Sequence, residues 1–421
     1  MLNNQEAAVL AAIDEAAAAR TLLELIAIPS VTGSAAESEI QHHLAGRLER
    51  LGLDVDLWGM DLPALYAHPG FPRTEAPREE AWGLVGHTPD GGDGPTLILQ
   101  GHVDVVPPGD LAAWEGDPFA PRVNGDVVHG RGACDMKAGL AAHLAALAAV
   151  RTAGVRLRGR VAVHFVVGEE DGGLGTFGTL LRGHAGDACL IAEPTAGTVI
   201  TANAGALTFR IAVPGRAAHA SSREAGVSAI DAYLPLHRAL ARLEAVRNRA
   251  PDPLLAEYPI PYSLSVGTLR SGDWASSVPD LLVAEGRLGV RLGEDPAEAR
   301  AALERCVAEA CAADPWLREN PARVTWPGGQ FASGRLPAGH PLRDAVAGAY
   351  ADATGAPPPR ERGATYGSDL RLYTAAGIPA LQFGPGDIAV AHSAREHVSV
   401  REVVDAARAV ALTVLRTVGT K

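Results

Sequence analysis

The sequence lacks the charge pattern that marks several classes of binding protein. It has no block rich in Lys or Arg, and its formal net charge is −12. Proteins that bind nucleic acid or an anionic membrane surface present clustered positive charge to the phosphate groups. The composition therefore argues against nucleic acid and membrane as partners.

Cysteines and long apolar runs are also scarce. Four cysteines, Cys134, Cys189, Cys306 and Cys311, are scattered over 421 residues. This spacing is not that of a disulfide framework, so we expect a reducing, cytoplasmic location. No uninterrupted apolar run reaches about 18 residues, which predicts no membrane span. The first 20 residues include acids but no basic segment, which indicates an amphipathic helix and not a signal peptide.

The chain nevertheless contains enough apolar material for large cores. Hydrophobic residues make up 47% of it and charged residues 20%, which is not a disordered profile. Its length exceeds that of one typical domain, so we expect two domains.

The order of strand and helix patterns predicts how these domains are arranged. Continuous apolar runs at 96–106, 159–171 and 187–195, with a helical pattern at 137–154, are typical of strands buried in an α/β sheet. Residues 203–332 instead alternate apolar and polar positions in a β-α-β-β-α-β order, which is the ferredoxin-like pattern. From residue 333 onward, the α/β pattern of the first part of the chain returns. We predict a discontinuous α/β domain, 1–202 and 333–421, with an inserted α+β domain at 203–332.

Residue types that bind metals gather where the predicted buried strands end. His102 and Asp104 end one strand, the pair Glu169–Glu170 ends the next, and Glu193 ends a third. Ligand sites of open α/β sheets lie at the carboxyl ends of their strands. One such residue alone is more often a core histidine or a solvated acid. The whole set predicts a metal site built from carboxylates and imidazoles.

Two further residues extend this set. Asp135 lies in the segment GRGACDMKAG, from Gly130 to Gly139, where small residues surround a single acid. Glycines allow the tight backbone that would present a carboxylate at a sharp turn. His392 follows the segment FGPGDIAVA near the end of the last strand region.

These segments resemble the motifs of the M20 metallopeptidase family, which includes acetylornithine deacetylase, succinyl-diaminopimelate desuccinylase, aminoacylase and carboxypeptidase G-type enzymes. The segment 101–139 resembles the family signature, and VVGEEDGGLGT, IAEPT, GRAAHASS and FGPGDIAVAHSAREHVSV resemble its later motifs in the same order. The resemblance runs over nearly the whole chain. It implies a zinc-hydrolase catalytic domain at 1–202 and 333–421, with a lid and dimerisation domain at 203–332.

The resemblance implies a dinuclear metal site. Two Zn²⁺ ions per subunit, or Co²⁺ or Mn²⁺ in their place, would be bridged by the carboxylate of Asp135. His102 and Glu193 would complete the shell of one ion, and Glu170 and His392 that of the other. Three carboxylates against two divalent ions leave a positive excess, which suits an anionic tetrahedral intermediate.

Two neighbouring residues receive catalytic roles from the same resemblance. Glu169 would be the general base that takes a proton from a metal-activated water and delivers it to the leaving amine. Asp104 would accept the free N–H of the His102 imidazole and so fix its tautomer. The peptide bond after Asp135 would be cis.

Substrate contacts are implied at three other places. His219, in GRAAHASS, would donate a hydrogen bond to the scissile carbonyl. Arg291 would bind a substrate carboxylate in a bidentate pair, although a strand-end surface charge explains this residue equally well. Backbone N–H groups of the turn from Gly384 to Gly386 would bind the same carboxylate.

We also expect a homodimer formed through the lid. The strand at 206–215 and the helix after it would form a lid edge that pairs with its twin in a two-fold contact. His219 of one subunit would then complete the oxyanion site of the other, with open and closed states.

The implied reaction is removal of an N-acyl group from an amino acid or similar small amine, with acetylornithine deacetylase-like action as the leading hypothesis. A dipeptidase or carboxypeptidase that acts on dipeptide-like substrates, or a deformylase, remains an alternative.

A non-catalytic scaffold protein would be expected to have lost a ligand or the base, yet all of them are present. Cys134 is a rival nucleophile, but the sequence places no histidine partner for it. Family members often have Asn where this chain has Ser277, which leaves the substrate open.

Overall fold

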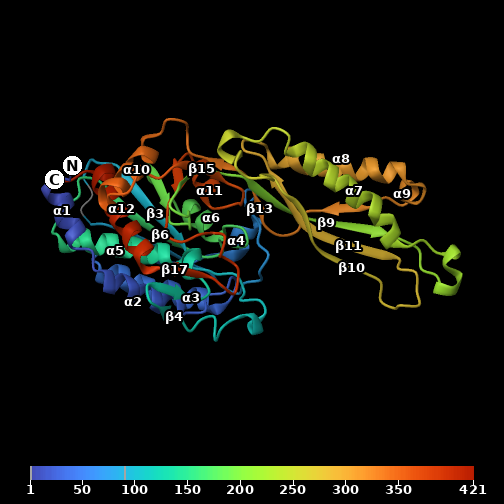
Figure 1. Ribbon diagram of the computed structural model, residues 1–421, viewed down its shortest axis with the longest axis horizontal. Coiled ribbons are helices and arrows are strands. Elements are labelled where there is room, and N and C mark those ends of the chain that lie inside the picture. Colours follow the sequence, from blue (N-terminus) through green and yellow to red (C-terminus); the bar gives the residue numbers. More distant parts are fainter. Residues whose placement is uncertain (1, 90–91) are drawn as a thin grey trace. The chain divides into compact units, whose positions relative to one another are not determined.

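The computed structural model describes residues 2–89 and 92–421, which form two compact units (Figure 1). The first unit comprises Met1–Ala202, Arg335–Arg362 and Asp369–Lys421, and the second comprises Asn203–Gly334 and Gly363–Ser368. The sequence predicts the return to the first unit at residue 333. In the structure the return follows Gly334, and a short later segment joins the second unit because Ala204 donates its backbone N–H to the carbonyl of Ala364 at 2.9 Å.

The first unit is built on a mixed sheet of nine strands. In spatial order these are β1 (Asp54–Gly59), β2 (Trp82–His87), β6 (Arg160–Val166), β3 (Thr96–His102), β7 (Ala188–Ile191), β16 (Ala380–Gln382), β8 (Val199–Asn203) and β14 (Gly334–Arg335), and β15 (Glu361–Ala364) pairs with β8. The central strands β6, β3, β7 and β16 run parallel to one another. Their carboxyl ends therefore meet at one edge of the sheet.

Both faces of this sheet are covered, as the apolar runs predict. Leu97 and Leu99 of β3 pack into one core with α5 (Ala138–Thr152) and α12 (Val400–Val418), whereas Ile98 packs into a second core with α11 (Leu370–Ala375). Successive side chains of a strand point to opposite faces, so a doubly covered strand is apolar throughout. The other helices of the unit are α1 (Asn4–Ala11), α2 (Glu15–Ile26), α3 (Ala35–Arg50), α4 (Leu62–Ala67), α6 (Leu174–Leu181) and α10 (Pro341–Thr354).

One helical stretch of this unit, Ala133–Thr152, is long and apolar enough by composition to cross a membrane. Of the 18 consecutive residues in which this stretch is most apolar, 89% are buried inside the protein. Asp135 and Lys137 also interrupt its apolar sequence. The stretch therefore has the surroundings of a core helix.

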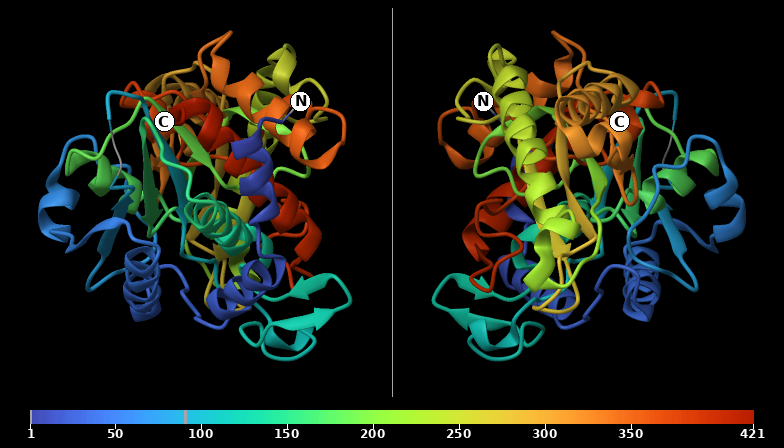
Figure 2. Two further views of the ribbon diagram at one scale, coloured as in Figure 1. Left: turned by 90° about the vertical axis from the view of Figure 1, so that its left-hand side faces the viewer. Right: turned by 90° about the vertical axis from the view of Figure 1, so that its right-hand side faces the viewer.

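A small antiparallel sheet joins two distant segments of the first unit. It consists of β17 (His397–Ser399), β5 (Val127–His129) and β4 (Arg122–Asn124). The β4–β5 hairpin projects from the body of the unit in both views of Figure 2. Because β17 follows His392 closely in the chain and β5 precedes Asp135, this pairing ties together the segments that carry these two residues.

The second unit has the predicted ferredoxin-like order. Its elements are β9 (Gly205–Pro214), α7 (Ala229–Arg247), β10 (Leu264–Ser271), β11 (Leu281–Val290), α8 (Pro296–Ala313), α9 (Pro315–Glu319), β12 (Arg323–Thr325) and β13 (Gln330–Phe331). The sheet order is β10-β11-β9-β12, and β13 also pairs with β9. The expectation that β9 forms an edge is therefore wrong. β9 pairs with β11 along its whole length and with β12 on its other side, so β10 is an edge strand instead.

Candidate metal centre

The parallel strands bring four of the predicted residues to one edge of the main sheet. His102 is the last residue of β3, Glu169 and Glu170 lie in the turn after β6, and Glu193 follows β7. Nε2 of His102 lies 3.9 Å from Oε1 of Glu193. The convergence that the strand-end pattern predicts is therefore present in the structure.

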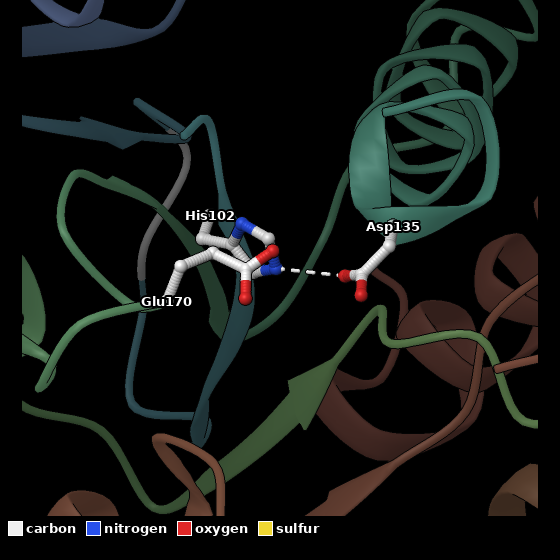
Figure 3. Close-up of side chains that lie close together, drawn as sticks. All are labelled: His102, Asp135 and Glu170. Atoms are coloured by element: carbon white, nitrogen blue, oxygen red, sulfur yellow. Dashed lines mark hydrogen bonds and ion pairs between the residues drawn. The ribbon is translucent and has the colours of Figure 1, made fainter. Parts of the chain in front are cut away.

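Asp135 reaches the same place from the kinked helical turn Ala133–Lys137 that precedes α5. Gly132, at the start of this turn, has a left-handed backbone with φ of 79°. The peptide bond between Asp135 and Met136 is cis, as the family resemblance implies. Figure 3 shows the carboxylate of Asp135 pointing toward His102, with Oδ1 at 3.1 Å from Nε2 of the imidazole.

His392 supplies a second imidazole on the other side of Asp135. Its Nε2 lies 3.4 Å from Oδ2 of Asp135 and 3.2 Å from Oε1 of Glu170. The His392 side chain is 51% exposed, whereas that of His102 is only 1% exposed. One imidazole thus lies at the surface of the site and the other at its base.

The five predicted ligands form two groups that share Asp135. Oδ1 of Asp135 faces His102, whose Nε2 is also 3.9 Å from Oε1 of Glu193. Oδ2 of Asp135 faces His392, whose Nε2 is also 3.2 Å from Oε1 of Glu170. The donor atoms of His102, Asp135 and Glu170 lie within 4.8 Å of one another, and so do those of His102, Glu169 and Glu193. Glu169 is therefore close enough to be a ligand itself, and distance alone does not separate a ligand from a base.

The charges of this cluster fit a site for cations. Within residues 2–89 and 92–421, the carboxylates of Asp135, Glu170 and Glu193 pair only with imidazoles, and none of them contacts a Lys or an Arg. Burial, followed by repulsion from Asp135, raises the pKa of Glu193 to about 8. Carboxylate oxygens and imidazole nitrogens are ligands of divalent metal ions, which would neutralise this repulsion. The side chains present therefore fit a pair of metal ions.

The imidazoles and the shared carboxylate attract one another strongly. Burial alone would lower the pKa of His392, but its hydrogen bonds to Asp135 and Glu170 raise it to about 11. Burial alone would raise the pKa of Asp135, but hydrogen bonds from His102 and His392 hold it well below its usual range. Asp135 is thus an ionised carboxylate between two imidazoles, which is the form that binds metal.

Glu169 has a different environment from the predicted ligands. Its Oε1 is buried and has no hydrogen-bond partner within the described part of the chain. Burial raises its pKa well above the usual range, and the charges of Asp369 and Glu193 add to this shift. A buried carboxyl group with a raised pKa is suited to accept and return a proton.

Asp104 does not make the contact with His102 that the family resemblance implies. Nδ1 of His102 lies 2.8 Å from the backbone carbonyl oxygen of Asp104, whereas the carboxylate Oδ1 is 3.7 Å away. The carboxylate instead accepts the backbone N–H groups of Glu169 at 3.1 Å and Glu170 at 3.3 Å. The backbone carbonyl of Asp104 therefore sets the tautomer of His102. The carboxylate of Asp104 points instead to the turn that carries Glu169 and Glu170.

Glu396 holds Asp135 in place, a role that no predicted residue fills. Oε1 of Glu396 accepts the backbone N–H groups of Cys134 and Asp135, each at 3.2 Å. Its other oxygen pairs with the buried guanidinium of Arg131. Glu396 lies in the polar segment SAREH, which looks like a surface loop. Its place four residues after His392, within the motif FGPGDIAVAHSAREHVSV, is the signal that the sequence offers.

Cys134 does not have the surroundings of a nucleophile. Burial raises the pKa of its thiol well above the usual range, and the charge of Glu396 adds to this effect. Its Sγ lies 3.7 Å from the carbonyl oxygen of Asp387. A neutral buried thiol is unreactive, which weighs against the rival cysteine mechanism.

The two glycines of the predicted substrate turn pack against the ligand segments. A Cβ on Gly384 would lie 2.6 Å from the carbonyl oxygen of Glu193, and one on Gly386 would lie 2.7 Å from Cβ of Cys134. The N–H of Gly384 points to Oγ1 of Thr195 at 3.4 Å. These glycines permit close approach to the metal centre, and their contact with a substrate carboxylate stays a prediction.

The remaining predicted residues belong to the second unit. His219 lies just before a helical turn at Ala220–Ala225, and its Nδ1 is 3.2 Å from the backbone N of Ser221. The guanidinium of Arg291 donates to the carbonyl oxygens of Arg247 and Val246, at 3.1 and 3.4 Å, where α7 ends. Arg291 thus caps a helix, and its binding of a substrate carboxylate stays a prediction.

Comparison with known proteins agrees with this geometry. Peptidase family M20/M25/M40 matches residues 98–416. The N-formyl-4-amino-5-aminomethyl-2-methylpyrimidine deformylase of Bacillus subtilis (strain 168) is 29% identical over 391 residues, which cover 87% of this chain and 86% of that protein. The succinyl-diaminopimelate desuccinylase of Gluconacetobacter diazotrophicus is 34% identical over 284 residues, which cover 64% and 66%. A solved dipeptidase from Saccharomyces cerevisiae shares the fold, with a TM-score of 0.76 at 15% identity over 97% of this chain and 98% of that one.

Proposed function

Since this chain belongs to peptidase family M20/M25/M40, whose members are metal-dependent hydrolases of amide bonds, we propose that it is a dinuclear zinc amidohydrolase. Its substrate is a small amine that carries an N-acyl group, such as an N-acyl amino acid. Water is added across the amide C–N bond, and the products are a carboxylic acid and a free amine.

One observation carries this proposal. The two carboxylate oxygens of Asp135 face different imidazoles, because Oδ1 lies 3.1 Å from Nε2 of His102 and Oδ2 lies 3.4 Å from Nε2 of His392. A carboxylate between two ligand groups suits two metal ions bound side by side. Zinc is the proposed ion because it favours imidazole and carboxylate ligands, which Co²⁺ and Mn²⁺ also accept.

Glu169 is the general base in this proposal. Bound metal ions would supply Lewis-acid polarisation of the amide carbonyl and would acidify water. The unpartnered Oε1 of Glu169 accepts the proton of that water as its oxygen attacks the carbonyl carbon. Glu169 then gives the proton to the amide nitrogen, so that the nitrogen leaves as a neutral amine when the C–N bond breaks.

We assign to His219 the hydrogen bond that stabilises the carbonyl oxygen. The backbone N–H of Ser221 donates to Nδ1 of His219, so in the neutral ring the proton is on Nε2. The side chain is exposed, and its Nε2–H is a suitable donor to an oxygen that gains negative charge during attack.

Two observations favour an N-formyl amine without a carboxylate as a second candidate substrate. A relative that covers 87% of this chain is named a deformylase of an N-formyl aminopyrimidine. The guanidinium of Arg291 already donates two of its N–H groups at the end of α7, so fewer of them remain for a substrate carboxylate. N-formyl compounds therefore stand beside N-acetyl and N-succinyl amino acids as candidate substrates.

A substrate panel tests the proposed function. Metal-loaded protein would be incubated with N-formyl, N-acetyl and N-succinyl amines and with dipeptides, and release of primary amine would be measured. We expect hydrolysis of one acyl class with kcat/KM at least about 100-fold above the others, because a pocket that hydrogen-bonds its substrate rejects analogues strongly. Preference for dipeptides would instead support the peptidase alternative, and turnover of none of them would contradict the proposal.

We further propose a homodimer formed by the edge strand β10 and helix α7 of the second unit. β10 ends the sheet, and an unpaired strand edge favours pairing with a second chain. Apolar side chains on both elements are exposed: Ile230 and Leu234 on α7 by 43% and 46%, and Leu269 on β10 by 49%. A two-fold axis would place the same surface of each copy in contact.

Subunit mixing tests whether His219 acts across this dimer. We expect His219→Ala and Glu169→Ala to be inactive separately, and a mixture of them to regain up to about a quarter of wild-type activity. A random mixture is half heterodimer, and a two-fold dimer would then have one complete site of its two. Adding Leu234→Asp to both chains should abolish the recovery. No recovery after verified subunit exchange would contradict action of His219 in the partner's site.

A further inference from the structure

A buried cluster of charges lies behind the turn that carries Glu169 and Glu170. Its centre is Arg78, whose side chain has no exposed surface. NH1 and NH2 of its guanidinium lie 3.0 Å from the two carboxylate oxygens of Asp171. Its Nε lies 3.2 Å from Oε2 of Glu37. We call these three residues, Glu37, Arg78 and Asp171, the Arg78 clamp.

Both carboxylates of the clamp are tied to the catalytic turn. Oε1 of Glu37 accepts the backbone N–H of Gly168 at 3.0 Å, and Asp171 follows Glu170 directly in the chain. The clamp therefore holds the turn at both ends, one residue before Glu169 and one residue after Glu170. The carboxylate of Asp104 holds the N–H groups between these ends.

Arg78 lies in the connection between β1 and β2, which packs directly against the turn. Oδ2 of Asp171 also accepts the N–H groups of Glu75 and Ala76 at 3.1 and 2.8 Å. A Cβ on Gly168 would lie 2.7 Å from NH2 of Arg78, and one on Gly172 would lie 2.0 Å from the carbonyl oxygen of Arg73. Glycines at these places allow the connection to lie on the backbone of the turn.

We propose that Arg78 is a positioning residue that fixes the orientation of Glu169 for catalysis. A planar guanidinium donates to two carboxylates in a fixed geometry, which a flexible ammonium group does not reproduce. Without Arg78, Glu37 and Asp171 would be two buried carboxylates that repel each other, and the turn would shift or loosen. This inference rests on the proposed function in so far as Glu169 is the base, but the ordering of the turn is independent of it.

The variant Arg78→Met tests the clamp. We expect kcat to fall on the order of 100-fold with KM changed by less than about threefold, because a small misplacement of a catalytic group costs rate and leaves substrate binding intact. Hydrogen–deuterium exchange of the peptide that spans 167–173 should become at least about 10-fold faster, because its amide hydrogen bonds open more often. Metal content and thermal unfolding would be measured on the same samples.

Arg247→Met is the matched control. Arg247 is also a buried arginine, with its side chain 3% exposed and paired with Glu294, but it lies in the second unit. It should lose stability without faster exchange at 167–173. If Arg78→Met does not fold, Arg78→Lys and Glu37→Gln replace it, with the same direction of change and about 10-fold lower kcat. Unchanged exchange and unchanged kcat in the folded variants would overturn the proposal. Faster exchange in a protein that hydrolyses no acyl substrate would support the clamp and contradict the proposed function.

Discussion

Glu169→Gln is expected to lower kcat by about 10³- to 10⁴-fold while the protein keeps both metal ions. Glutamine has nearly the same shape as glutamate, but its neutral amide group accepts no proton near neutral pH. The carboxyl Oε1 of Glu169 has no hydrogen-bond partner among the described residues, so its replacement breaks no contact that holds the fold. The measurement is kcat at saturating substrate, together with metal content by mass spectrometry.

Glu170→Gln is the control for this prediction. Oε1 of Glu170 lies 3.2 Å from Nε2 of His392, so we expect this variant to lose the ion near His392. The comparison is needed because the donor atoms of Glu169 also lie within 4.8 Å of those of His102 and Glu193. If Glu169→Gln lost an ion and Glu170→Gln kept both, the roles of the two residues would be exchanged.

Removal of metal is expected to abolish activity completely, and Zn²⁺ or Co²⁺ should restore it. Among residues 2–89 and 92–421, only imidazoles balance the charge of the carboxylates of Asp135, Glu170 and Glu193, so the site suits cations. Dialysis against a chelator, followed by titration with each ion, should give full recovery at two ions per chain. Full activity in a metal-free preparation would contradict the proposed mechanism.

The variant Asp135→Asn tests, in the same metal titration, whether the carboxylate of Asp135 is needed for both metal ions. Because its two oxygens face His102 and His392, we expect loss of both ions from this one substitution. Glu193→Gln, in contrast, should weaken only the ion near His102. A thermal shift on metal addition provides a second readout, because an ion that binds only the folded state raises its stability. Asp135→Asn should lose this shift.

Much of the architecture follows from local patterns. The run TLILQGH becomes β3, and the alternating strands at 205–214 and 281–290 become half-covered strands of the second unit. Helix ends are less certain from sequence. The amphipathic helix expected in the first 20 residues is in fact two helices, α1 and α2, because Asp14 caps a new helix by accepting the N–H of Ala17 at 2.8 Å.

The position of a strand within its sheet is not written in such patterns. β9 alternates apolar and polar residues as an edge strand would, yet it lies between β11 and β12. One face of β9 packs into the core of the second unit through Leu207, Phe209 and Ile211, whether the strand is central or at an edge. Alternation therefore reports which face is covered, and strand order depends on hydrogen bonds to distant segments.

By itself the sequence determined which strands are buried and which ligand-type residues end them, because strand periodicity and residue chemistry are local properties. Only the tertiary structure decided which distant residues hold the segments of the metal site in place. Glu396 holds Asp135 across 261 residues of chain, and Arg78 holds Asp171 across 93. The carboxylate of Asp104 turns to the N–H groups of Glu169 and Glu170, although the family resemblance implied His102 as its partner. A buried charge finds its partner through the packing of distant segments, and no local pattern records that partner.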